Sequence, residues 1–429
     1  MRKILVLGSD FGTLYVVKKA QEMGLYTIVA DLMETSPTKQ QADEAWNIST
    51  TDIDLLEKKC RENDIIAVMF GASDFNISNA RELCKRLGLP IYCDNDFSWR
   101  ISRNKSEFKK ICCEVGAPVP QGFFVSDRFV EEELCGIQYP VVVKPSDKSG
   151  NRGMSYCNNR KELIQAYKYA RTISDDTIIV ERRLHGDEYN VHYVLADGEA
   201  RLLYYSCTHH QQGQQENLYS FKCTTSCHLK QYLEEVDDKA IAVLKRVGCK
   251  EGIAWFDMIR DEDGKFYILE MGYRFGGVMT YVPYERVSGF DTIKWMLEIS
   301  LGKKHSVVDL PQSLNQVYTG CAGSYHLFTV KEGCVRHISG LEEISRLPNV
   351  WIDIPKRMGN QVRYNACMGL IGVYAEHIST LCDTLNTINN KLKIENADGE
   401  NMIIYFNGFD QLKSEYLKGL TQFHSVSEL

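Results

Sequence analysis

Short apolar runs alternate with segments of helical periodicity through the first 97 residues. The runs KILVLG, YTIVAD and IIAVMFG have the length and composition of buried strands, and each precedes a helical pattern. Two of these patterns close at Gly24 and Gly88, and glycine is the residue that most often ends a helix. Strands that alternate with helices build a parallel sheet covered on both faces, so this stretch predicts a wound α/β domain.

The turn GSDFGT after the first strand resembles part of a dinucleotide-binding site. Gly8 and Gly12 are present, and Asp31 ends the second strand, where an acid would bind the ribose. The G-x-G-x-x-G spacing is incomplete, which favours a Rossmann-like layer with a structural role. An NAD-binding oxidoreductase that uses Gly8 is the alternative.

Composition limits the cellular setting and the partners. A chain of 429 residues exceeds one ordinary core, so several domains are expected. The net charge of −7 disfavours a nucleic-acid partner, and an odd count of fifteen cysteines without a CxxC pair favours reduced thiols. The apolar start is too short for a signal peptide, and no segment reaches the ~20 apolar residues of a membrane span. We therefore expect a cytoplasmic protein without a membrane partner.

The pattern changes after residue 97. A helix is predicted over residues 100–115, followed by short strands and hairpins to about residue 280, and later by helices at DTIKWMLEISLG and ISTLCDTLNTINNKLK. Only HSVSEL at the end has the composition of a disordered tail. The expected fold class is mixed α/β and α+β. The predicted domains are residues 1–97, 98–305 (with lobes 98–182 and 183–305) and 306–429.

The segment GIAWFDMIRDEDGKFYILEMGYRFGG, residues 252–277, predicts a hairpin. Asp263-Gly264 is the preferred centre of a two-residue type I′ turn. That turn pairs Glu262 with Lys265, Arg260 with Tyr267, and Asp257 with Glu270. Two opposed carboxylates repel by about 3–4 kcal/mol at an effective dielectric near 20, so a cation should lie between them. Oxygen ligands suit Mg²⁺; a solvated pair, or one carboxylate answered by Arg274, is the alternative.

A second informative stretch is VVVKPSDKSGNRGMS, residues 141–155. An apolar strand ends at Lys144 and Pro145, and a loop with Gly150 and Gly153 follows. Such a loop offers backbone N–H groups and positive charge to anionic oxygens. Because no lysine follows its glycines, it does not match a P-loop.

The order of these features resembles the ATP-grasp superfamily, closest in layout to its biotin carboxylase and carbamoyl-phosphate synthetase branch. Lys105 lies in a helix after the first domain and Lys144 ends a strand, and these are followed by VERRL, GDEYNV and the carboxylate hairpin. The resemblance covers residues 1–305 and extends more weakly to the end. It implies a Rossmann-like preATP-grasp domain, a two-lobed ATP-grasp domain and a C-terminal α+β closure.

The resemblance also implies ATP and Mg²⁺ as cofactors and assigns residues to them. The loop becomes a flap over the triphosphate, and Arg274 holds the substrate acid. The implied ATP contacts are Lys105, Lys144, Ser146, Ser149, Gly150, Arg152, Gly153 and Met154 for the phosphates, Glu181 and Leu184 for adenine, and Glu188 for the ribose. Asp257 and Glu270 bind the metal. The family commonly has asparagine where this chain has Gly272, which puts a second ion in doubt.

The implied reaction joins a small carboxylic acid, an amino acid included, to an amine through an acyl phosphate. A homodimer is a further expectation from the resemblance. A carboxylase that activates bicarbonate is the alternative within the fold, although the chain has no Met-Lys-Met biotin-carrier motif. An inactive ATP-binding regulatory protein is a third reading, suggested only by Gly272.

Histidines and cysteines crowd the segment 204–228. His209, His210, Cys223, Cys227 and His228 do not have the spacing of a common structural zinc module, so a Gln-rich polar loop at the substrate end is expected instead. His209 or His210 is then a candidate phosphate contact or base toward the amine. Three tyrosines and an arginine are candidates to shape the acid pocket, with plain packing as the alternative: Tyr273, Tyr281, Tyr284 and Arg286.

Overall fold

Four parallel strands form the sheet of the first domain in the computed structural model. Their order is β3 (Glu44–Trp46), β2 (Tyr26–Ala30), β1 (Lys3–Leu7) and β4 (Ile65–Phe70). The connecting helices are α1 (Thr13–Glu22), α2 (Pro37–Gln41), α3 (Ile53–Glu62) and α4 (Asp74–Leu87). The predicted wound α/β domain is confirmed, with β3 as an additional edge strand. The structure describes residues 2–210, 219–311, 318–355 and 358–424.

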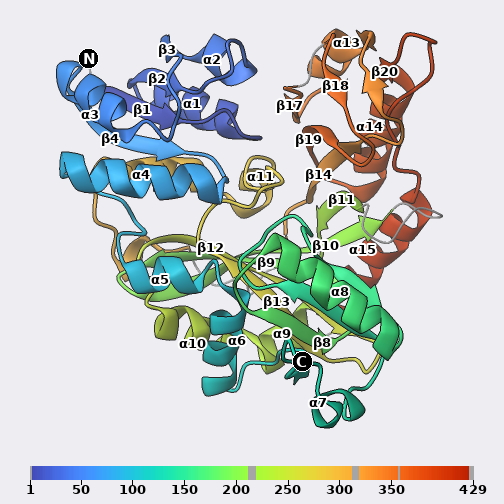
Figure 1. Cartoon of the computed structure of the whole chain (residues 1–429). Coiled ribbons are helices and arrows are strands. Elements are labelled where there is room, and N and C mark those ends of the chain that lie inside the picture. Colours follow the sequence, from blue (N-terminus) through green and yellow to red (C-terminus); the bar gives the residue numbers. More distant parts are fainter. Residues whose placement is uncertain (1, 211–218, 312–317, 356–357, 425–429) are drawn as a thin grey trace.

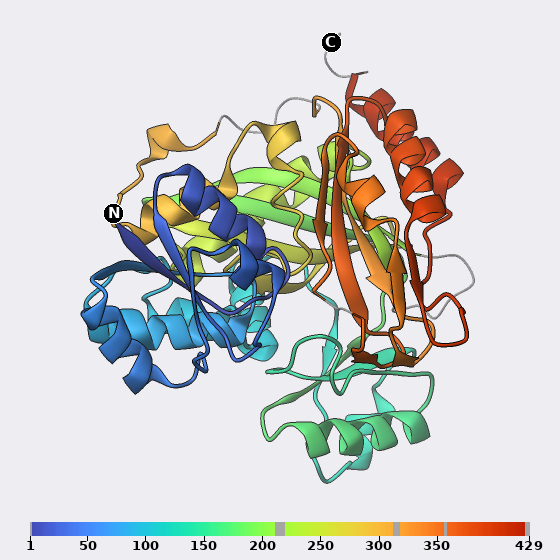
Figure 2. The ribbon, with the colours of Figure 1, turned by 90° about the horizontal axis from the view of Figure 1, so that it is seen from above.

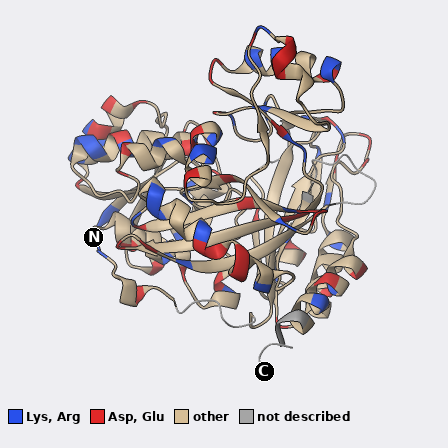
Figure 3. Ribbon diagram, turned by 90° about the horizontal axis from the view of Figure 1, so that it is seen from below, with Lys and Arg blue, Asp and Glu red and all other residues tan. Residues whose placement is uncertain are grey.

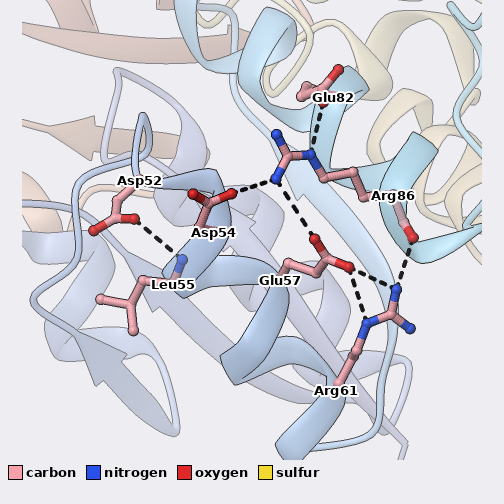
Figure 4. Close-up of polar contacts among 7 residues, drawn as sticks. All are labelled: Asp52, Asp54, Leu55, Glu57, Arg61, Glu82 and Arg86. Atoms are coloured by element: carbon pink, nitrogen blue, oxygen red, sulfur yellow. Dashed lines mark hydrogen bonds and ion pairs between the residues drawn. The ribbon is translucent and has the colours of Figure 1, made fainter.

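Helices α3 and α4 are joined by a network of charged side chains (Figure 4). Arg86 contacts Asp54 at 2.5 Å and Glu82 at 2.8 Å, while Arg61 contacts Glu57 at 2.8 Å and donates to the Arg86 carbonyl. These groups are largely exposed, so each pair adds little to stability. The network links α3 to α4, the helix whose first residue, Asp74, contacts Arg274 of the site described below.

The helix predicted over residues 100–115 is divided into α5 (Asp96–Ile101) and α6 (Lys105–Glu114). Asn104 causes the break, because its side chain accepts hydrogen bonds from the N–H groups of Ser106 and Glu107 and so caps the start of α6. The cap makes Lys105 the first residue of a helix rather than part of a helix interior.

The first lobe is a four-stranded sheet covered by helix α8 (Arg160–Ile173). Its strands lie in the order β5 (Gly122–Phe123), β8 (Ile178–Arg182), β6 (Val141–Pro145) and β7 (Ser155–Cys157), with α7 (Glu131–Cys135) nearby. Figure 2 shows this lobe projecting from the rest of the molecule. Its apolar side chains form a core separate from the others.

An eight-stranded sheet spans the second lobe and the C-terminal region. The strand order is β13 (Phe266–Gly272), β12 (Gly252–Asp261), β9 (Gly186–Ala196), β10 (Glu199–His210), β11 (Tyr219–Thr224), β14 (Cys321–Phe328), β19 (Cys367–Ala375) and β17 (Val350–Asp353). This sheet continues across residue 305, where the sequence suggested a boundary. The proposed domain limits therefore remain a prediction.

Helices cover this sheet and join its strands. They are α9 (Leu229–Glu235), α10 (Asp237–Val247), α11 (Glu285–Ser288), α12 (Thr292–Ser300), α13 (Leu341–Ser345), α14 (Ile378–Lys391), α15 (Phe409–His424) and the short 3₁₀ turn at Val307–Asp309. Two small strand pairs, β15 (Gly333–Cys334) with β18 (Gln361–Val362) and β16 (His337–Ser339) with β20 (Lys393–Glu395), complete the C-terminal region. The expected helices at 292–300 and 378–391 are confirmed.

Acidic and basic residues alternate along the ribbon rather than gathering on one element (Figure 3). All fifteen cysteines are free thiols. Within the described ranges, no helix combines the length and the apolar character needed to cross a membrane. The predicted disordered tail HSVSEL begins at His424, which is the last residue of α15, and residues 425–429 lie outside the described residues. The predicted loop over 204–228 is largely wrong, because β10 and β11 occupy 204–210 and 219–224; residues 211–218 lie outside the described residues.

Candidate active site

A cleft with a cavity of about 630 Å³ lies between the first lobe and the eight-stranded sheet. Strands β6 and β8 form one wall, and β9 to β13 form the other. Most of the predicted site residues line it: Lys105, Lys144, Ser149, Gly150, Arg152, Met154, Glu181, Leu184, Glu188, His210, Asp257 and Glu270. Four predicted residues do not, namely Ser146, Gly153, His209 and Arg274.

Asp257 and Glu270 face each other across the β12–β13 ladder, as predicted. The turn between them is different from the prediction. Asp261 and Lys265 close a three-residue loop in which Gly264 has φ +78°, so the type I′ turn is wrong. The outer pairs shift by one residue, so that Arg260 faces Phe266, and a bulge between Asp257 and Met258 restores the carboxylate pair.

Cationic side chains surround the two carboxylates. Lys105 Nζ lies 2.7 Å from Glu270 Oε2, and Lys222 Nζ lies 3.8 Å from Asp257 Oδ1. Asn190 donates to the same Asp257 oxygen at 2.6 Å. Burial would raise the pKa of Glu270, but Lys105 and Lys144 outweigh it and lower that pKa, so Glu270 is anionic.

The chemistry of this donor set fits a magnesium ion. Burial raises the pKa of Asp257, with Lys222 opposing and Glu270 adding to the shift. A second positive charge is therefore needed to keep both carboxylates ionised. Two opposed carboxylates in a polar cleft are the oxygen ligands that Mg²⁺ prefers, together with phosphate oxygens.

Glu181 lines the cleft, but its carboxylate is engaged by two lysines. Its carboxylate is buried and contacts Lys144 Nζ at 2.7 Å, and Lys109 contacts the other oxygen. Burial lowers the pKa of Lys144 to about 8 and that of Lys109 well below its ordinary value. Lys144 is thus a cation of the cleft wall that loses its proton within a moderate pH range.

The predicted flap has the backbone that its glycines suggested. Gly150, Asn151 and Gly153 all have positive φ angles, at 63°, 57° and 78°. A side chain at Gly153 would approach Pro145 Cγ to 2.9 Å, which explains why Gly153 supports the loop without lining the cavity.

Ser146 acts through its backbone. Its carbonyl accepts from the Lys105 N–H at 2.9 Å, and its own N–H donates to Thr177. The Ser146 side chain is fully buried. Ser146 therefore positions Lys105, whose ammonium also donates to the Lys148 carbonyl of the flap at 2.9 Å.

The two adjacent histidines lie on opposite faces of strand β10. His210 lines the cleft, with its Nε2 3.4 Å from Glu188 Oε2. His209 is buried against Phe221 and Phe406 on the other face. Because strand side chains alternate, only one of the pair was able to face the cleft, and the structure excludes His209 from it.

Arg274 is locked in place beside the cleft. Its Nε and Nη2 donate to the two oxygens of Asp74 at 2.5 and 3.3 Å, and its Nη1 donates to the Phe275 carbonyl at 2.8 Å. The guanidinium lies over the Trp255 ring, 5.1 Å from the centroid. A guanidinium has five N–H donors, so these three contacts leave two for a planar anion.

Gly272, the departure from the family pattern, is explained by Trp255. The two residues are directly opposite in the ladder, and a Cβ on Gly272 would lie 2.2 Å from Trp255 Cε2. The indole therefore occupies the space in which an asparagine side chain would begin. The three candidate pocket tyrosines are likewise packing residues, since Tyr273, Tyr281 and Tyr284 are at most 2% exposed.

Several residues of the site were not predicted from the sequence. Asn190 lies two residues from Glu188 on β9, and this spacing was an available signal for a shared face. Lys222 on β11 and Asp74 on α4 come from distant parts of the chain, and no local pattern marks them.

The GSDFGT turn is filled by the protein itself. The Gly12 N–H donates to Asp353 Oδ2 at 2.6 Å, which places a carboxylate at the start of α1. A Cβ on Gly12 would lie 2.0 Å from the Tyr281 hydroxyl. The position where a dinucleotide phosphate would bind is thus taken by Asp353, which argues against the oxidoreductase alternative.

Comparison with known protein families agrees with the resemblance to ATP-grasp proteins. Residues 104–308 match the family described as carbamoyl-phosphate synthase L chain, ATP binding domain. The predicted resemblance to the ATP-grasp superfamily is confirmed for this ATP-binding region, and the solved structures below share the fold. The prediction of an ATP-dependent enzyme is confirmed as well.

Solved structures share the fold over nearly the whole chain. The L-amino acid ligase from Bacillus licheniformis superposes with a TM-score of 0.75 at 17% identity, covering 95% of this chain and 99% of that one. The biotin carboxylase domain of Hydrogenobacter thermophilus 2-oxoglutarate carboxylase gives 0.72 at 16% identity, covering 96% and 93%.

The proteins that are similar in sequence align over only part of their own length. The 2-oxoglutarate carboxylase small subunit of H. thermophilus is 22% identical over 324 residues, or 71% of this chain and 67% of its own length. Methylcrotonoyl-CoA carboxylase subunit alpha of Mus musculus is 24% identical, and the alignment spans 70% of this chain but only 44% of that protein. A D-alanine--D-alanine ligase from Halorhodospira halophila is 30% identical over 132 residues, covering 30% and 42%.

Proposed function

We propose that this protein is an ATP- and Mg²⁺-dependent carboxylate–amine ligase. The observation that supports it best is one cleft in which the Asp257–Glu270 pair faces Lys105 and Lys144 beneath a glycine-containing flap. Opposed carboxylates with two ammonium groups suit a metal–triphosphate complex, which brings both positive and negative charge. The substrates would be a small acid, such as an amino acid, and an amine.

The residues of the cleft would bind different parts of the substrates. Lys105 and Lys144 would neutralise phosphate oxygens, and Glu188 would bond the ribose hydroxyls near His210. Asp257 and Glu270 would hold Mg²⁺, which when bound offsets charge on the β- and γ-phosphates. The two remaining N–H groups of Arg274 would orient the acid so that its carboxylate attacks the γ-phosphate.

The resulting acyl phosphate needs protection from water until the amine arrives. The flap residues Ser149, Gly150 and Arg152 already line the cavity, so their closure over the nucleotide would exclude solvent. His210, on the cleft face, is placed to contact a phosphate or accept a proton from the amine. His209 has no part in this scheme, because it lies on the opposite face of the sheet.

A bicarbonate-activating carboxylase is the second candidate. Carboxylases are among the relatives that align over about 70% of this chain, and one solved neighbour, the 2-oxoglutarate carboxylase domain, was crystallised with bicarbonate. Bicarbonate is a planar anion like a carboxylate, so the two N–H groups of Arg274 would suit it equally well.

The release of phosphate from ATP in the presence of Mg²⁺ distinguishes the ligase from the carboxylase. Pools of carboxylic acids are added with and without amines, and bicarbonate is tested alone. Release that requires an acid and an amine, and is lost in Glu270→Gln, would support the ligase. Glu262→Gln, an exposed glutamate in the turn of the same hairpin, is the matched control and should keep full activity.

Two other outcomes of this assay would support a different function. Release with bicarbonate alone would favour the carboxylase. Tight ATP binding without turnover in any pool would favour a regulatory ATP-binding protein.

We also propose a cytoplasmic location, with which fifteen free thiols agree, and a homodimer, which gel filtration with light scattering would test.

A further inference from the structure

A second polar cluster lies on the face of the eight-stranded sheet away from the cleft. Cys207, His209 and Glu415 each offer one ligand atom there, and these atoms all lie within 4.8 Å of one another. Cys207 and His209 are two residues apart on β10 and so share a face. Glu415 comes from helix α15, which packs beside the end of this strand (Figure 1).

We propose that Cys207, His209 and Glu415 form a binding site for a divalent transition metal of the zinc type. Sulfur, imidazole nitrogen and carboxylate oxygen are the zinc ligands of proteins, and three protein ligands with one further position form a common coordination set. Oxygen-only sites such as Asp257–Glu270 suit Mg²⁺ instead. The site is independent of the proposed reaction.

The distances within the cluster suit a metal better than a direct hydrogen bond. His209 Nδ1 lies 3.4 Å from Glu415 Oε2, which is longer than usual for an N–H···O bond. Two ligands bound about 2.0–2.1 Å from a tetrahedral ion are separated by roughly 3.3 Å. The imidazole and carboxylate are therefore already spaced as metal ligands, and the Cys207 sulfur lies within 4.8 Å of both ligand atoms.

The surroundings prepare the ligands for this role. Gln411 donates to Glu415 Oε1 at 2.7 Å, which leaves Oε2 for the ion and fixes the carboxylate. Burial lowers the pKa of His209 to about 4, so the ring is neutral at physiological pH. Burial, followed by the nearby Glu415 and Asp187 charges, raises the pKa of the Cys207 thiol, so the surroundings alone disfavour the thiolate and only a bound cation would stabilise it.

Binding has a defined proton balance. The Cys207 S–H bond breaks as the sulfur–metal bond forms, and its proton passes to solvent. His209 binds through the Nδ1 lone pair, so its ring proton resides on Nε2. The site carries charges of −1 from the thiolate and −1 from Glu415, which together neutralise a divalent ion.

The position of α15 gives such a site a structural purpose. A Cβ on Gly419 would lie 2.5 Å from the Cys227 backbone nitrogen, so the helix already packs closely against the segment after β11. A metal would fasten α15 to β10, whose opposite face carries Thr208 and His210 into the cleft. Loss of the ion would therefore loosen the wall of the ATP site from behind.

Cobalt(II) titration of the full reduced chain tests the proposal. We expect one equivalent to produce the near-ultraviolet thiolate charge-transfer band and the visible bands of a tetrahedral site, and Zn²⁺ to displace it. Cys207→Ser should abolish the thiolate band and weaken Zn²⁺ binding at least tenfold. Glu415→Gln, on a partly exposed helix face, should weaken it while leaving the fold intact by circular dichroism.

Two control variants make the result specific. Cys223→Ser changes a buried cysteine paired directly with Cys207 in the sheet and should keep the band. Asp257→Asn, which removes the cleft carboxylate, should keep it too, so that a failure of the proposed ligase leaves this test unaffected. The proposal is overturned if the wild-type chain gives no thiolate band, or if the band survives in Cys207→Ser.

Discussion

Substitution of Gly272 by alanine tests whether Trp255 explains the unusual glycine in the hairpin that carries Asp257 and Glu270. Gly272 lies in strand β13 without a positive φ angle, so its backbone suits any residue. In an open strand this change would stabilise the chain by about 0.5–1 kcal/mol, because glycine loses more conformational entropy on folding. Here the new methyl group would lie 2.2 Å from Trp255 Cε2.

The buried indole has little freedom to move. Trp255 is 7% exposed and carries the Arg274 guanidinium on its ring. Forcing a methyl group into such a contact costs about 1–3 kcal/mol, which exceeds the entropic gain. We therefore expect Gly272→Ala to lower the melting temperature by about 1–2 °C for each kcal/mol lost in a chain of 429 residues. Gly277→Ala is the matched control, since no atom lies within 4 Å of its added Cβ.

A double-mutant cycle measured by denaturant unfolding isolates the contact. Trp255→Ala alone leaves a cavity worth about 3–5 kcal/mol, but in the Gly272→Ala background part of that cavity is filled. The loss of unfolding free energy in the double mutant should therefore be smaller than the sum of the losses in the two single mutants. The difference should exceed the roughly 0.5 kcal/mol expected for independent sites. A Gly272→Ala chain as stable as the wild type, or a strictly additive cycle, would refute the reasoning.

Three further predictions concern charged groups. Asp74→Asn removes the charge that fixes Arg274, so the KM for the acid should rise several-fold while the KM for ATP is unchanged, and steady-state kinetics would show the difference. Because burial lowers the pKa of Lys144 to about 8, this lysine loses its charge above that pH. The Kd for ATP should then rise by up to about tenfold per pH unit, which titration calorimetry would measure. Lys144→Arg stays charged, so its Kd should show no such rise. Asp353→Asn weakens the charged contact to the Gly12 N–H and should lower stability by about 0.5–2 kcal/mol in a melting experiment, whereas an unchanged melting temperature would show that the contact is dispensable.

The carboxylate pair shows how far local pattern carries a prediction. The sequence placed Asp257 opposite Glu270 by counting from a two-residue turn, and the pair is there. The count succeeded because two irregularities cancel: a longer turn shifts the register by one residue, and a bulge shifts it back. Bulges depend on strand twist and neighbouring strands, which a local pattern does not record.

The parts of the site that escaped prediction come from strands and helices distant in sequence. Alternation along β10 requires His209 and His210 to face opposite ways, but only the packing of α15 decides which one meets the cleft. Lys222 reaches Asp257 only because β11 joins the same sheet. The periodicity of apolar residues predicts which segments are helices or strands. Which residues meet across the cleft depends on the order of the strands in the sheet.

The GSDFGT turn shows the same principle in the choice between two functions. A glycine-containing turn before a helix creates an anion-binding position, because unpaired N–H groups and the helix dipole both point outward. The sequence identifies that position but not the anion. In this fold β17 crosses back to the first domain, and the Tyr15 hydroxyl donates to the Ile352 carbonyl beside it. The anion is then Asp353, supplied by the chain itself. A turn of the kind that binds a cofactor phosphate elsewhere instead connects the C-terminal region to the first domain, which agrees with the proposal that the nucleotide binds in the cleft between the first lobe and the large sheet.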